Sequence, residues 1–144
     1  MAGVGFYNAD QYVISMGGVR IQGFADGEFC NIKPTRPKFE RVVGVDGEVA
    51  RGRNSDRTII AKFILLQTSA SNLYLSTLIQ TDMDAPNGAG VVPLLMQDIS
   101  GNSIVTAAQA WAVDFPELSY DRGVKTCEWT IETGMAIYVA GGNH

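Results

Sequence analysis

Apolar and polar residues alternate along most of this chain with the period of two that is typical of antiparallel strands. The clearest stretch is 124–133, in which Cys127, Trp129 and Ile131 alternate with threonines and glutamates. Turn signals such as Gly17-Gly18 separate the stretches. The pattern predicts strands over 12–16, 19–24, 29–33, 39–45, 57–68, 91–99, 103–115, 124–133 and 135–139.

One segment, 71–81, has the period of a helix instead. Leu75, Leu78 and Ile79 fall on one face of this segment, and mainly polar residues fall on the other. Pro86 prevents a helix from continuing much further. We therefore expect a single helix over about 71–81 among many strands.

These elements predict a mainly β fold, in which two packed antiparallel sheets form a small barrel or sandwich with one flanking helix. A length of 144 residues and a hydrophobic fraction of 46% are sufficient for one buried core. We expect a single domain over 1–144, with an eleven-residue polar loop at 46–56, longer than the two to five residues of an ordinary hairpin loop.

The strand at 57–68 has more apolar surface than one core requires, because Phe63, Ile64, Leu65 and Leu66 are apolar on both faces. Two explanations are open. The strand is central, with the helix on its second face, or a second subunit covers that face. Under the second explanation Phe63 and Leu65 are candidates for a subunit interface.

Charge is distributed unevenly along the chain. The net charge is −4 and the pI is near 4.8, which argues against general nucleic-acid binding. Eight of the eleven basic residues fall between Lys33 and Lys62, whereas eight acidic residues follow Phe63. This segregation fits either an ordinary solvated surface or a basic edge on one copy that meets an acidic edge on the next.

The sequence contains few residues from which an active site is built. The sole histidine is His144, and the two cysteines, Cys30 and Cys127, are too few for a metal set or a disulfide framework. Asp82-x-Asp84 resembles the start of a calcium loop, but Pro86 stands where a ligand belongs. We expect no enzyme activity, metal or cofactor. The apolar runs are too short to span a bilayer, so we expect no membrane insertion.

Several short motifs follow one another in a fixed order. They are Gly23-Phe24-Ala25-Asp26-Gly27-Glu28, Arg36-Pro37-Lys38-Phe39-Glu40, Gly44-Val45-Asp46-Gly47-Glu48, Arg51-x-Arg53-Asn54-Ser55-Asp56 and Gln67-Thr68-Ser69-Ala70-Ser71-Asn72. Their order resembles that of the tail tube proteins of contractile-tailed bacteriophages, over essentially the whole chain.

The resemblance implies a fold shared with the tube proteins of type VI secretion systems and bacteriocin particles. It implies a structural virion protein, assembled in the host bacterial cytoplasm, that forms hexameric rings. The rings stack into the tail tube, which conducts DNA through its lumen during ejection without binding it specifically. The implied partners are other copies of the chain, the tail sheath protein, and the baseplate and tail terminator proteins.

The resemblance suggests a role for the segment 46–56, and the alternation of the strand at 124–133 suggests candidates for the lumen wall. The segment 46–56 is expected to contact the neighbouring ring through Asp46, Gly47, Glu48, Arg51, Arg53, Asn54 and Asp56. Glu128 and Glu132, with Asp114, are candidates for the lumen wall, and an exposed outer face is the competing interpretation of these three positions.

Two other functions remain open. The chain could be the tube subunit of a phage-like bacteriocin or type VI secretion system, for which DNA transit would be absent. It could instead be a monomeric β-sandwich binding module that binds a ligand through its loops. An enzyme ranks third, because the residues of an active site are lacking.

Overall fold

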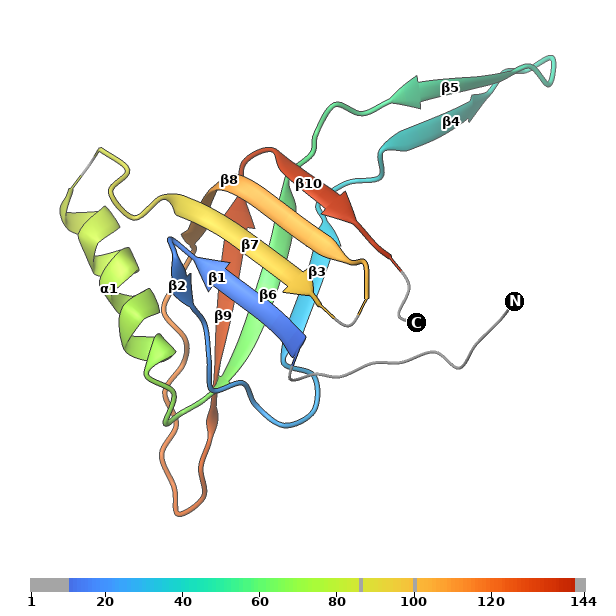
Figure 1. Ribbon diagram of the computed structural model, residues 1–144. Coiled ribbons are helices and arrows are strands. Elements are labelled where there is room, and N and C mark those ends of the chain that lie inside the picture. Colours follow the sequence, from blue (N-terminus) through green and yellow to red (C-terminus); the bar gives the residue numbers. More distant parts are fainter. Residues whose placement is uncertain (1–10, 86, 100, 142–144) are drawn as a thin grey trace.

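The computed structural model describes residues 11–85, 87–99 and 101–141, and these residues form ten strands and one helix (Figure 1). All nine expected strands are present, and a tenth, β5, lies within the segment expected to be a loop. The bounds are β1 (Tyr12–Met16), β2 (Val19–Arg20), β3 (Cys30–Pro34), β4 (Phe39–Val43), β5 (Val49–Arg53), β6 (Ile59–Leu66), α1 (Ser71–Asp84), β7 (Val92–Asp98), β8 (Ile104–Ala112), β9 (Thr126–Thr133) and β10 (Ala136–Val139).

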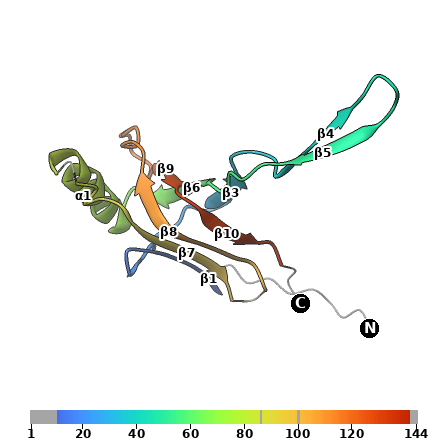
Figure 2. The ribbon, with the colours of Figure 1, turned by 90° about the horizontal axis from the view of Figure 1, so that it is seen from above.

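Eight strands form one bent antiparallel sheet in the order β2-β1-β7-β8-β9-β6-β3, with β10 also paired to β8. The sheet bends at β8, because one edge of this long strand pairs first with β10, through residues 104–107, and then with β9, through residues 110–112. The half containing β1, β7 and β10 therefore crosses the half containing β9, β6 and β3, as Figure 2 shows from above. The expected mainly β class is confirmed: the arrangement is sandwich-like, and the described strands do not close into a barrel.

The core lies between the two halves of the sheet and beneath the helix. Strand β9 alternates as expected, with Cys127, Trp129 and Ile131 buried. The indole Nε1 of Trp129 donates a hydrogen bond to Oδ1 of Asn72 at 2.9 Å, which connects the core to the first turn of α1. A buried indole N–H needs such a partner, so this contact helps to fix the helix on the sheet.

Phe63 and Leu65 belong to this core, and their expected role in a subunit interface is wrong. Both side chains are 0% exposed, and they lie opposite Trp129 and Cys127 in the ladder between β6 and β9. Because strand side chains alternate, the opposite face of β6 presents Ile60, Lys62, Ile64 and Leu66 outward instead. A neighbouring copy could contact only that outward face.

Strand β8 contains a bulge that turns Trp111 away from the core. Between two pairs with β7, Leu94↔Ala107 and Val92↔Ala110, β8 has one residue more than its partner. The extra residue exchanges the inward and outward positions beyond it. Trp111 is therefore partly exposed, and Ala110 takes the buried position.

Helix α1 is confirmed, although it extends three residues beyond the expected end. Leu75 and Ile79 face the core, and Ala85 ends the helix in an extended conformation. Asp82 is accommodated near the negative helix end because its carboxylate accepts a hydrogen bond from the backbone N of Gly90 at 3.4 Å. A Cβ at Gly90 would lie 2.5 Å from Cβ of Asp82, so this close approach requires glycine.

Candidate assembly surfaces

A two-stranded hairpin projects from the sheet, and we call residues 39–53 the arm. Strands β4 and β5 pair from Phe39↔Arg53 to Val43↔Val49, and every residue of both is exposed. Figures 1 and 2 show the arm extending away from all other elements. The tip is a tight turn, in which the backbone N of Gly44 donates to O of Glu48 at 2.7 Å and Gly47 has a positive φ of 87°.

The expected loop at 46–56 is therefore not a loop, because its middle residues form β5. Asp46, Gly47 and Glu48 lie in the tip turn, Arg51 and Arg53 lie on β5, and Asn54 and Asp56 lie at the root of the arm. The segment pairs with β4 because Val42 and Val43 stand opposite Ala50 and Val49, which gives the hairpin a short apolar ladder.

Asp56 anchors the root of the arm to the sheet. Its carboxylate accepts hydrogen bonds from the backbone N of Thr58 at 2.9 Å, from Oγ1 of Thr58 at 2.6 Å and from Oγ1 of Thr35 at 3.3 Å. These bonds, with a lesser contribution from Arg36 at 3.7 Å, hold the pKa of Asp56 below its usual range. Asp56 therefore fixes the direction in which the arm leaves the sheet rather than offering a free contact surface.

The anchor predicts acid-sensitive order at the root. Because the pKa of Asp56 is lowered in the folded chain, the stabilisation is fully present above the ordinary Asp pKa of about 4 and is lost as pH falls through the folded value. We expect the Thr58 amide to exchange several-fold faster in Asp56→Ala at neutral pH, with Glu48→Ala as a control at the tip. Equal exchange rates at Thr58 in the wild type and Asp56→Ala would contradict the anchor.

The outward faces of the two halves of the sheet differ in charge. On β3, β6 and β9 the outward residues include Lys33, Lys62, Glu128 and Glu132, and Lys62 lies 3.5 Å from Glu128. On the other half, the outward cross-strand row Val13-Gln97-Ile104-Val139 contains no charged residue, and the neighbouring row Arg20-Ser15-Leu95-Thr106-Ile137 contains Arg20 alone. The first face suits water or ions, and the second suits contact with protein.

The three lumen candidates do not lie on one surface. Glu128 and Glu132 share the outward face of β9, as the alternation of this strand predicts. Asp114 follows the end of β8 and instead lines a groove of about 390 Å³ beside α1. The other residues of this groove are Ile79, Asp82, Met83, Trp111, Ala112, Val113 and Phe115. The groove was not predictable from the sequence, because a bulge in β8 and the end of a helix together create it.

Both cysteine thiols are protonated at neutral pH in the folded chain. Burial raises the pKa of the Cys30 thiol to about 11, and burial likewise raises the pKa of Cys127, so neither thiol is activated as a nucleophile. Within the described ranges, no three His, Cys, Asp or Glu residues are grouped as a metal site would require. Helix α1, the one helix of the described residues, is not long and apolar enough to cross a membrane.

Comparison with known proteins provides both a sequence relative and structural neighbours. No family model matches the chain. Structural protein ORF10 of Pseudomonas phage KPP10 is 27% identical over 123 residues, which are 85% of this chain and 71% of that protein.

The solved structures that share the fold come from contractile injection systems. The PVC sheath/tube terminator has a TM-score of 0.67 and 12% identity, over 96% of this chain and 100% of that one. The anti-feeding prophage tube-terminating cap has a TM-score of 0.61 and 7% identity, over 96% and 94%. A chain of the PVC sheath–tube complex has a TM-score of 0.62 and 11% identity, over 93% and 91%. The resemblance to contractile-tail tube proteins is thus confirmed at the level of fold: this chain has the architecture of contractile injection-system tube and terminator proteins, and its phage relative is a structural protein.

Proposed function

We propose that this chain is a structural subunit of a phage tail tube. Six copies form a ring, and rings stack into a tube that lies inside the sheath, ends at the terminator and baseplate proteins, and conducts DNA in the virion. The observation that carries the proposal is the free-standing arm on a fold shared with tube and terminator proteins.

The arm supports the proposal of assembly, because a free-standing hairpin of this kind gains little stability from its own chain. An isolated two-stranded hairpin is marginally stable in water. This one exposes Phe39, Val42, Val43, Val45 and Val49, which is costly unless another molecule covers them. Stacking onto a neighbouring subunit would bury these side chains and order the hairpin at the same time.

The outward faces of the two halves of the sheet support a division of roles within the ring. The charged face contains Glu128 and Glu132, and we assign these two residues to the lumen wall, where negative charge repels DNA phosphates and prevents retention. Asp114 is assigned to a protein contact instead, because it lies in the groove beside α1. The face of β1, β7, β8 and β10, on which Arg20 is the one charged residue of the two rows described, replaces Phe63 and Leu65 as a candidate surface between subunits.

A tube terminator is the second candidate, because two of the three solved structures described above are terminators and one of them matches over its whole length. A terminator forms one ring and stops, whereas a tube subunit adds ring upon ring. The tube of a bacteriocin or secretion system is a further alternative. Neighbouring genes distinguish that alternative from a phage tail, since capsid and terminase genes accompany a phage tail.

Self-association in solution tests the proposal. Multi-angle light scattering of the full chain at micromolar concentration is expected to give masses of six chains or more, at low and moderate salt. A single 15.5 kDa species at every concentration would contradict the proposal and favour a monomeric binding module. A mass that stops at one ring would favour the terminator.

A further inference from the structure

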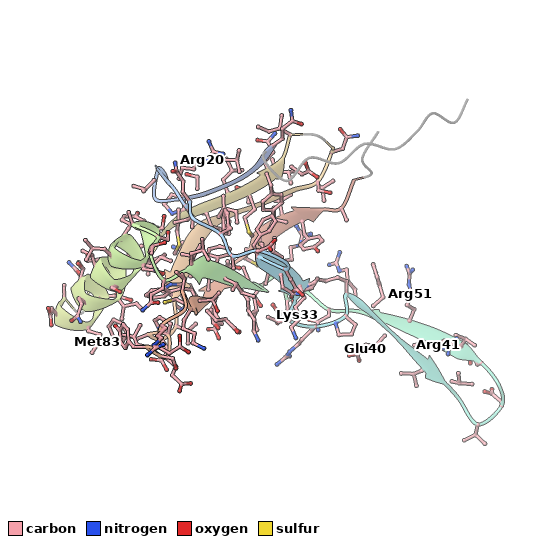
Figure 3. The ribbon with its side chains drawn as sticks, turned by 90° about the horizontal axis from the view of Figure 1, so that it is seen from below. Arg20, Lys33, Glu40, Arg41, Arg51 and Met83 are labelled. Atoms are coloured by element: carbon pink, nitrogen blue, oxygen red, sulfur yellow. The ribbon has the colours of Figure 1, made fainter. Side chains whose placement is uncertain are left out.

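The two faces of the arm differ in charge, because its three arginines all lie on one face. Cross-strand partners share a face, so the register places Phe39, Arg41, Val43, Val49, Arg51 and Arg53 on one face, which we call the arginine face. The other face carries Glu40, Val42, Ala50 and Gly52. Figure 3 shows that the arm side chains, those of Glu40, Arg41 and Arg51 among them, stand clear of the rest of the molecule.

The arginine face is arranged for a negatively charged, partly apolar partner. The guanidinium of Arg51 lies over the ring of Phe39, with Cζ 4.5 Å from the centroid, which holds the cation against an apolar surface. Within the part of the chain that the structure describes, Arg41, Arg51 and Arg53 form no ion pair. Their donors are therefore available to carboxylates of another molecule.

The groove beside α1 has the matching properties. Asp82 and Asp114 line it together with Met83, Trp111 and Phe115, and Met83 is 69% exposed. Asp84 follows at the helix end, beside the groove and outside its lining, and the last turn of the helix has no basic residue. The negative end of the helix dipole adds to these three carboxylates. The groove thus combines an acidic rim with exposed apolar side chains, as the arginine face combines arginines with Phe39 and two valines.

The arm and the groove lie at opposite ends of the molecule. In Figure 1 the arm extends from one side of the sheet, and the end of α1 lies on the other side. Figure 3 likewise places Met83 at the end opposite to Arg41 and Arg51. An arm therefore cannot reach the groove of its own chain. A contact between two different patches of identical copies is head-to-tail, and such contacts build rings or open stacks.

We infer that the arginine face of each arm docks in the acidic groove of a second copy. The inference rests on the proposed function and specifies the surface through which subunits join. Arg41, Arg51 and Arg53 face the carboxylates of Asp82 and Asp114 in the groove and of Asp84 beside it, while Phe39 contacts the apolar residues of the groove. Duplex DNA is the other polyanion to which an arginine face could bind, and the test includes it.

The inference is tested by reversing charge on each side separately. The arm variant is Arg41→Glu/Arg51→Glu/Arg53→Glu. The groove variant is Asp84→Arg/Asp114→Arg, which leaves the Asp82 hydrogen bond to Gly90 intact. Asp26→Arg/Glu117→Arg is a control with the same change in net charge at exposed positions outside the groove. Circular dichroism confirms that each variant is folded before assembly is measured.

We expect each of the two variants to raise the concentration needed for assembly by about tenfold or more, because like charges then meet at the contact. The control is expected to assemble as the wild type does. Mixing the arm variant with the groove variant is expected to restore assembly, because reversed arms then meet reversed grooves. Restoration by mixing is a result that general loss of stability cannot produce.

Three results would overturn the inference. If the wild type assembles and the groove variant assembles equally well, the groove is rejected as the docking site and the proposed function still stands. If the wild type retards linear duplex DNA at physiological salt and the arm variant does not, the arm binds nucleic acid instead of a second copy. A wild type that stays monomeric rejects the proposed function and the docking together.

Discussion

Removing the arm is expected to give a folded chain that no longer assembles into a tube. In the variant, Asn-Gly replaces residues 37–56 and joins Arg36 to Arg57. The ladder between β3 and β6 continues to this point, because the backbone N of Thr35 donates to O of Thr58 at 3.2 Å. A two-residue turn therefore closes the same hairpin. No buried side chain is removed, since every residue of 37–56 is exposed or half-buried.

The expected measurements are a thermal midpoint within a few degrees of that of the wild type and a solution mass no larger than one ring. A shorter deletion would be a poor test: replacing only 47–55 removes all of β5 and leaves β4 without its partner. Assembly of the armless chain into full-size particles would show that the arm is dispensable. Unfolding of the armless chain would show that the arm belongs to the core.

Truncating Phe63 is expected to have the largest effect on stability. Its side chain is fully buried between the halves of the sheet, so Phe63→Ala removes a large apolar group and leaves a cavity. The expected cost is about 3–5 kcal/mol in the free energy of unfolding, measured by urea denaturation. Ile64→Ala, on the outward face of the same strand, is the matched control, with an expected cost of about 1 kcal/mol or less.

The comparison of Phe63→Ala with Ile64→Ala also separates a core role from an interface role. A residue that acted only in a subunit interface would leave the unfolding of the single chain unchanged and would weaken assembly alone. A Phe63→Ala chain as stable as the wild type, with assembly lost, would contradict the placement of Phe63 in the core.

Strand positions were predictable from the sequence wherever one face is buried and the other is wet. Strand β9 is the clearest case, because Cys127, Trp129 and Ile131 face the core and Glu128 faces water. The helix was predictable for the same reason, since Leu75 and Ile79 repeat at helical spacing on its buried face. In these segments burial within one chain determines the pattern, and the pattern is visible in the sequence.

The arm was not predictable as a hairpin, because neither of its faces is buried in the single chain. Arg51-Gly52-Arg53 has the composition of a polar loop, and only pairing with β4 makes it a strand. Phe63 was misassigned because apolar residues on both faces of β6 do not reveal which face points inward. The acidic groove depends on the bulge in β8 and on the contact between Asp82 and Gly90, both of which are tertiary features.

The most direct test of the account is negative-stain electron microscopy of the purified full chain. The account predicts round end views with a central opening and side views of stacked rings, at concentrations where light scattering reports masses above one ring. Fields that contain only small particles without an opening, from a sample with a solution mass of 15.5 kDa, would contradict the central claim that the chain builds a tube.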